Sequence, residues 1–157
     1  MVARTLGWLG TANRLLGLSD EGLDRMEKSL KTLERLKNNA EQADAWNEIA
    51  HLRFEAGRLD DAEAAASCAV KLTQGTDQEN LACRSHRLLG NIYHFKGRVD
   101  EARHNFQVAL GIALNSSWQY ELFWIHYSMA YLFLDEAKFD IAQDCVEKAK
   151  SSVVEDA

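Results

Sequence analysis

Mostly apolar positions recur along this chain at helical spacing, and the same pattern returns every 40 residues. The clearest copy starts at His86, which Leu89, Gly90 and Tyr93 follow at the i+3, i+4 and i+7 positions of one helix face. Equivalent stretches begin at residues 6, 46 and 126. Alternation of the kind that marks β-strands is hard to find. The pattern therefore predicts an all-α protein.

Four short segments mark joints between the predicted helices. They start at residues 17, 57, 97 and 137, and each has an aspartate in fourth place and a small residue in sixth place. The first residue, which is glycine except for Ala137, suits the left-handed conformation that ends a helix. The aspartate suits the first turn of the next helix, where a negative charge lies near unpaired N–H groups. The small sixth residue indicates that two helices approach closely there.

These signals predict eight helices in four antiparallel pairs. We place the helices at residues 3–16, 19–36, 42–56, 59–74, 79–96, 99–115, 119–136 and 139–153. The repeats then cover about 3–40, 43–80, 83–120 and 123–154, within a single domain over residues 1–157. Because one helix pair cannot bury its apolar face alone, the repeats are expected to stack into a solenoid.

The third repeat resembles the tetratricopeptide signature, W-x2-L-G-x2-Y followed by A-x3-F. Leu89, Gly90 and Tyr93 match the first part, His86 replaces its tryptophan, and residues 102–106 match the second part. The other copies are weaker, and the closing proline is missing. The 40-residue period is similar to the long-helix variety in Pins-type adaptors, kinesin light chains and sensor regions of STAND-class ATPases. The resemblance implies a right-handed superhelical α-solenoid of four repeats.

The resemblance also implies a binding surface, because in this family the first helix of each pair lines a concave groove. The residues that map onto the partner-binding positions are Asn47, His51, Arg84, Arg87, Asn91, His94, Trp124, Tyr127 and Tyr131. Two adjacent arginines can hold carboxylates, so we expect a protein or peptide partner with acidic and aromatic residues. The alternative is that these residues bind no partner and are simply the solvated positions of a structural spacer.

Aromatic residues crowd the start of the helix predicted at 119–136, namely Trp118, Tyr120, Phe123 and Trp124. They either pack on the preceding helix or offer anchor residues to a partner, since aromatic side chains dominate binding hot spots.

Composition narrows the classes of function. The chain has no proline, which favours many helices joined by short turns. Its formal charge of −6 argues against general nucleic-acid binding, which relies on lysine and arginine to neutralise phosphates. No apolar run approaches the roughly 18 residues of a membrane span. The three cysteines, Cys68, Cys83 and Cys145, form no CxxC pair, so we expect thiols in a reducing compartment, the cytoplasm. Residues 1–19 faintly resemble a transit peptide, but they are in register with the repeat.

Candidate chemistry is sparse. The sequence has no GxSxG, HExxH or P-loop motif, and we expect no catalytic residue, metal or cofactor. Cys83 and His86 have a spacing compatible with metal ligation, but two ligands do not make a zinc site. His86 and His126 are expected to pack between helices.

The sequence thus predicts a protein–protein interaction scaffold rather than an enzyme. The alternative is a ligand-sensing or autoinhibitory repeat fragment of a larger STAND-type ATPase or regulator. The first and last helices carry apolar residues with little to cover them. We therefore expect either an excised piece of a longer solenoid or a homodimer through the terminal repeats.

Overall fold

The structure, a computed structural model, describes residues 19–154. Helices joined by short turns fill this part of the chain, which contains no strand. The helices are α2 (Ser19–Leu36), α3 (Asn39–Glu55), α4 (Leu59–Thr73), α5 (Glu79–Phe95), α6 (Val99–Asn115), α7 (Gln119–Asp135) and α8 (Phe139–Val154). The predicted all-α architecture is confirmed over these residues, whereas the predicted helix at 3–16 lies outside them.

Six of these seven helices begin at the residue predicted from the sequence, and α3 is the exception. It begins at Asn39 instead of residue 42. The cause is a side-chain cap, because Oδ1 of Asn38 accepts a hydrogen bond of 3.1 Å from the backbone N–H of Glu41. The helix therefore starts at Asn39, the last residue of the polar segment 37–39 that the sequence pattern placed in a loop.

The turns within the helix pairs share one backbone geometry. Gly57 and Gly97 have φ angles of 73° and 72°, and Ala137 takes the same left-handed conformation at 57°. At each turn the residue after this position donates its N–H to a carbonyl five residues earlier, which closes the end of the first helix. These bonds run from Arg58 to Arg53, from Arg98 to Tyr93 and from Lys138 to Phe133, at 2.8, 2.8 and 2.9 Å.

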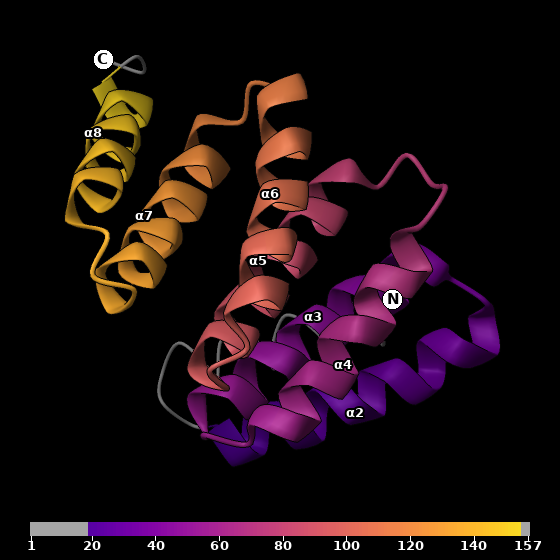
Figure 1. The fold of residues 1–157 in the computed structure, drawn as a ribbon. Helices are drawn as coiled ribbons and strands as arrows, with labels where there is room; N and C mark the ends of the chain where they lie inside the picture. The colour runs from indigo at the N-terminus through magenta and orange to yellow at the C-terminus, as the bar shows by residue number, and fades with distance from the viewer. Residues whose placement is uncertain (1–18, 155–157) are drawn as a thin grey trace.

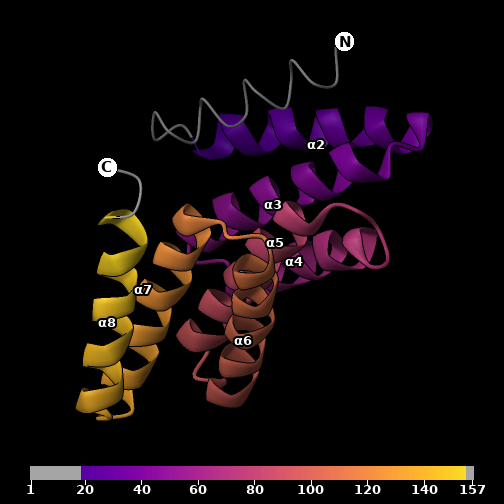
Figure 2. The ribbon, with the colours of Figure 1, turned by 90° about the horizontal axis from the view of Figure 1, so that it is seen from above.

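The helices stack in chain order. Figure 1 shows this order from α2, in indigo, to α8, in yellow, and Figure 2 shows it from above. The most extensive contacts join α3 with α4, α5 with α6 and α7 with α8, which are the predicted helix pairs. In addition, α3 contacts α5 and α5 contacts α7. The first helices of successive pairs therefore form one continuous layer.

The core is divided into local clusters that follow the stack. The largest joins α2, α3, α4 and α5 and includes Met26, Ile49 and Leu88, all at most 2% exposed. Smaller clusters lie between α5, α6 and α7 and between α7 and α8. The small residues predicted at close helix contacts are buried, with Ala62 and Ala102 fully inaccessible. Each repeat thus buries its apolar face against its neighbours, as a solenoid requires.

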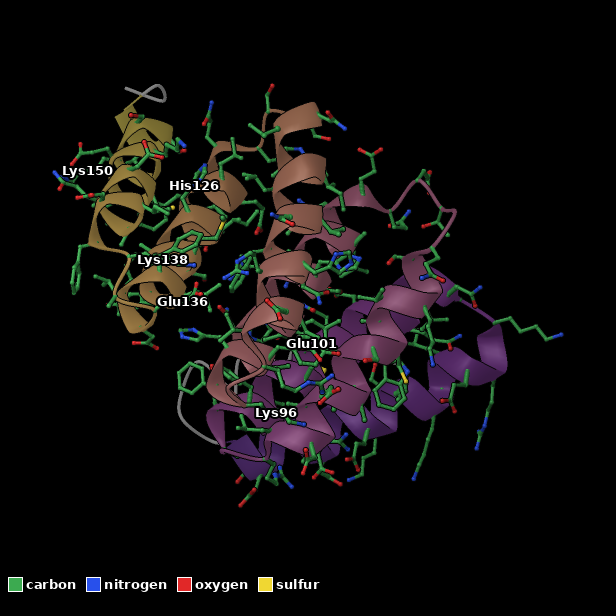
Figure 3. The ribbon with its side chains drawn as sticks, in the orientation of Figure 1. Lys96, Glu101, His126, Glu136, Lys138 and Lys150 are labelled. Carbon is green, nitrogen blue, oxygen red and sulfur yellow. The ribbon has the colours of Figure 1, made fainter. Side chains whose placement is uncertain are left out.

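Ion pairs connect successive repeats near the ends of α5 and α7, where Figure 3 labels Lys96 and Glu136. Lys96 pairs with Asp60 of α4 at 2.6 Å, and Arg103 pairs with Glu136 at 2.8 Å. The hydrogen bond from Arg103 lowers the pKa of Glu136 below its usual range. Lys96, Arg103 and Glu136 are partly buried, at 20%, 29% and 20% exposed, and their pairs tie successive repeats together.

Candidate functional site

Two adjoining pockets lie along the layer of α3, α5 and α7 and share Arg87 and Trp124. Together they form what we call the inner groove. One pocket has a volume of about 410 Å³ and is lined by Phe54, Arg87, Asn91, His94, Phe95, Trp124, Tyr127, Ser128, Tyr131 and Asp135. The other, of about 650 Å³, is lined by Glu48, His51, Glu55, Arg84, Arg87, Tyr120, Glu121 and Trp124. Eight of the nine predicted groove residues therefore line one surface.

The exception is Asn47, which is fully buried instead of facing the groove. Its Oδ1 accepts a hydrogen bond of 3.2 Å from the hydroxyl of Ser85, also fully buried. Asn47 therefore joins α3 to α5 beneath the groove floor, and its assignment as a partner-contacting residue is corrected. Its Nδ2 is buried without a hydrogen-bond partner. Asn47 lies on the helix that the resemblance predicted, but the close contact of α3 with α5 covers its side chain.

Aromatic rings form both walls of the smaller pocket. On one side Phe54 and Phe95 meet edge to face, with ring centroids 5.1 Å apart. On the other side Tyr127 lies 5.7 Å from Trp124 and 5.0 Å from Tyr131. The i, i+3 and i+4 spacings of α7 place these rings on one helix face. The hydroxyls of Tyr127 and Tyr131 share a hydrogen bond of 3.1 Å, which raises the pKa of Tyr127.

The two groove arginines are already paired with carboxylates. Nε of Arg87 donates to Glu121 at 3.1 Å, and both side chains are mostly buried, at 14% and 6% exposed. Arg84 donates to Glu48 at 3.1 Å and lies 3.5 Å from Asp44. These acids come from the neighbouring repeats. The guanidinium groups therefore hold the layer together and do not present uncompensated positive charge.

The groove's far end carries a histidine–carboxylate pair. Nε2 of His94 donates to Oδ2 of Asp135 at 2.7 Å, which links the last turns of α5 and α7. The Asp135 carboxylate remains 73% exposed. Sequence reasoning missed Asp135 and Phe95 as groove residues. Their signal was the period itself, because residues 55, 95 and 135 are equivalent and all three line the groove.

The aromatic residues at the start of α7 divide between the two predicted roles. Trp118 packs against the cluster that contains Leu122 and Ala109. Tyr120 is 70% exposed and lines the larger pocket. Trp124 lines both pockets, and Phe123 stacks on Tyr127. One part of the group therefore supports the fold, and the other part faces the groove.

Reactive groups are not assembled in the described residues. Within residues 19–154, no group of three or more histidine, cysteine or acidic side chains could hold a metal ion. The three cysteines are free thiols. Burial raises the pKa of the Cys83 thiol to about 12, so it stays protonated and unreactive. None of the helices at 19–154 is long and apolar enough to cross a bilayer.

The paired helices, the common turn geometry and the layer of first helices define a helical repeat protein. The sequence profile described as "Tetratricopeptide repeat" matches residues 41–115. Residues 41–115 are tetratricopeptide repeats by this profile, and the described helices continue the same stacked architecture on both sides of the matched segment. The fold of this family is that of protein–protein interaction scaffolds. No curated protein sequence matches the chain.

Solved structures share the fold at low sequence identity. BtubC (BKLC) from P. vanneervenii is 20% identical with a TM-score of 0.84, and the alignment covers 97% of this chain and 63% of BtubC. The apo form of RapI is 12% identical with a TM-score of 0.88, covering 98% of this chain and 56% of RapI. MamA is 17% identical with a TM-score of 0.70, covering 98% and 80%. The chain thus spans less than two thirds of BtubC and of RapI.

Proposed function

We propose that the inner groove binds a peptide or protein partner and that the chain acts as an interaction scaffold, not as a catalyst. The observation that carries this proposal is the exposed aromatic surface of the smaller pocket. Phe95, Tyr127 and Tyr131 are 69%, 41% and 50% exposed. A contiguous exposed apolar patch is typical of an interaction site, and aromatic residues dominate binding hot spots.

A side chain of the partner would enter the smaller pocket and contact its aromatic rings. The sequence also predicted acidic residues in the partner. Such a residue would have to compete with Glu121 for Arg87 and with Glu48 for Arg84. We therefore propose that the aromatic walls, and not the arginines, provide most of the affinity.

The test is to select peptides that bind the chain from a random display library and to titrate them by calorimetry. Tyr131→Ala removes an exposed ring from the groove and should weaken binding by about tenfold or more, as expected for a hot-spot residue. Leu114→Ala is the matched control, because Leu114 is 57% exposed in the last turn of α6 and does not line the groove. Equal affinity of both variants would place the binding surface elsewhere.

Reversing the charge of Arg87 is a poor substitute for this test. A glutamate at that position would face the buried carboxylate of Glu121. Two like charges in a mostly buried site destabilise the fold, so lost binding would not report on contact with the partner.

A second candidate is a ligand-sensing or autoinhibitory repeat segment of a larger regulator. This candidate follows from the resemblance of the 40-residue period to sensor regions of STAND-class ATPases. A nucleotide-binding segment encoded in the same reading frame would support it, and a gene that encodes these repeats alone would exclude it.

Self-association is a separate proposal. The last described helix, α8, exposes Phe139, Ile141 and Val153 at 65%, 46% and 57%. A homodimer through the terminal repeats would cover them, and light scattering would then give twice the chain mass of 17.7 kDa. A monomer at high concentration contradicts the dimer.

We also propose that residues 1–157 form one right-handed domain of four repeats in the reducing cytoplasm.

A further inference from the structure

We propose that the smaller pocket of the inner groove is a cation site, which takes an arginine or lysine side chain of the bound partner. This inference rests on the proposed peptide-binding function and specifies the chemistry of the partner. It replaces the acidic partner residues predicted from the sequence with basic ones.

The walls of the pocket carry the first argument. Five aromatic residues from three helices surround one space of about 410 Å³: Phe54, Phe95, Trp124, Tyr127 and Tyr131. The face of an aromatic ring is electronegative, and a cation within about 6 Å of the ring centroid is attracted to it. Because rings from three helices line the pocket, an inserted cation would lie near more than one ring. A neutral apolar side chain would gain only burial there.

The charges around the groove carry the second argument. Four carboxylates line it, from Glu48, Glu55, Glu121 and Asp135, against two arginines, which gives a formal charge of 2 − 4 = −2 with neutral histidines. Arg87 lines the smaller pocket, but its charge is compensated by Glu121 at 3.1 Å. The whole chain carries −6. A basic partner is therefore attracted over the groove as a whole, and an acidic one is repelled.

Asp135 supplies a carboxylate at the pocket itself. Only one of its oxygens, Oδ2, receives the hydrogen bond from His94. An ionised carboxylate has about four acceptor positions, so the bond from His94 leaves capacity for a second donor. With 73% exposure, Asp135 lies where the charged end of an entering side chain could reach it from solvent.

The chain already contains the same combination elsewhere. The guanidinium of Arg98 lies 4.4 Å from the centroid of the Tyr93 ring, and it donates to Glu63 and Glu101 at 2.9 and 2.8 Å. One cation is thus held by a ring face and carboxylates together. The smaller pocket offers the rings and the carboxylate of this arrangement on a surface open to a partner.

The experiment compares three short peptides that differ in one side chain. Acetyl-Leu-Arg-Leu-amide is the probe, the citrulline peptide has nearly the same shape without the charge, and the glutamate peptide reverses the charge. Each is titrated into the full chain and followed by two-dimensional NMR, in which the indole N–H signal of Trp124 is assigned with a Trp124→Phe variant. We expect the arginine peptide to shift this signal and to bind at least about fivefold more tightly than the citrulline peptide.

Two variants locate the effect. Tyr127→Leu keeps apolar bulk but removes an aromatic ring from the pocket, and Asp135→Asn removes the carboxylate charge. Each substitution should weaken the binding of the arginine peptide by roughly threefold to tenfold. Phe139→Leu and Asp140→Asn are matched controls on α8, outside the inner groove, and they should leave the affinity for the arginine peptide unchanged. Circular dichroism checks that all four variants keep the helical content of the wild type.

The outcomes separate this inference from the proposed function. If the citrulline peptide binds as tightly as the arginine peptide at the Trp124 signal, the groove binds peptides but is not a cation site. Tighter binding of the glutamate peptide also overturns the inference and restores the acidic partner. No shift of the Trp124 signal by the arginine peptide up to about 10 mM overturns it as well. In that case, the selected peptides and the Tyr131→Ala variant still decide the proposed function.

Discussion

At Gly90 the helices α5 and α6 approach so closely that a methyl group would lie 2.5 Å from two ring carbons of Phe106. Phe106 is fully buried, so its ring has little room to move. The sequence identified both residues as matches to the tetratricopeptide signature. It could not show that they touch, because this contact depends on how α5 and α6 pack.

We predict that Gly90→Ala destabilises the protein by about 1–3 kcal/mol, although alanine favours helices over glycine by about 1 kcal/mol. Gly111→Ala is the matched control in α6, since a Cβ there meets no atom within 4 Å. It should stabilise by about 0.5–1 kcal/mol. Urea unfolding of both variants measures this contrast. Stabilisation by both substitutions would contradict the close contact at Gly90.

His126 makes the stability sensitive to pH. Burial, assisted by the positive charge of Lys148, lowers the pKa of His126 below its ordinary value of 6.5. Its Nδ1 is buried without a hydrogen-bond partner. The unfolded chain therefore binds a proton more readily than the folded chain. The contribution of neutral His126 to the free energy of unfolding should therefore be complete above about pH 6.5. It should be lost as the pH falls toward and through the lowered pKa of the folded state.

The measurement is the urea midpoint between about pH 7.5 and pH 5, above the range in which carboxylates titrate. His126→Gln should reduce the loss of stability toward low pH. His104→Gln should keep the wild-type dependence, because His104 is exposed on α6. If His126→Gln and the wild type lose stability equally, this histidine is not the cause.

At the scale of the helices, most boundaries followed from the sequence because the signals are local. The turn residues and the aspartates lie next to the helix ends that they fix, and this is why six helix starts were predicted correctly. The start of α3 was wrong because Asn38 was interpreted as a helix breaker, although its side chain caps the helix. Asparagine serves in both roles, and the preceding sequence does not distinguish them.

The turn between α7 and α8 gives a prediction at this scale. Ala137 holds the left-handed conformation that glycine holds in the equivalent turns, with a φ of 57°. This conformation costs a residue with a Cβ about 1–2 kcal/mol. Ala137→Gly should therefore stabilise the protein by about 0.5–1 kcal/mol, after the larger entropy of the unfolded glycine chain is subtracted.

The control is the same substitution within a helix. Ala64→Gly, at an exposed position of α4, should destabilise by about 0.5–1 kcal/mol. Thermal or urea unfolding of both variants shows whether each substitution raises or lowers the free energy of unfolding. Loss of stability in Ala137→Gly, equal to that of Ala64→Gly, would show that Ala137 carries no conformational strain.

At the scale of the whole molecule, the sequence predicted the positions of most groove residues, but it did not predict that the two groove arginines are paired with carboxylates. The family positions depend on helix register, which the 40-residue period fixes, so eight of nine residues lie where they were expected. The partners of Arg84 and Arg87 are 34 to 40 residues away in the chain. Such pairs depend on how neighbouring repeats stack. The sequence therefore counted two arginines as available, whereas the structure shows them paired.

The central claim, that a partner enters the groove between α5 and α7, is tested most directly by filling the smaller pocket. Asn91 lies in its lining, so Asn91→Trp would occupy the space without changing the charge. Asn80→Trp is the control, on an exposed position in the first turn of the same helix. For a peptide selected on the wild-type chain, Asn91→Trp should raise the dissociation constant by about tenfold or more, whereas Asn80→Trp should leave it unchanged. An unchanged dissociation constant for a folded Asn91→Trp variant would contradict the account.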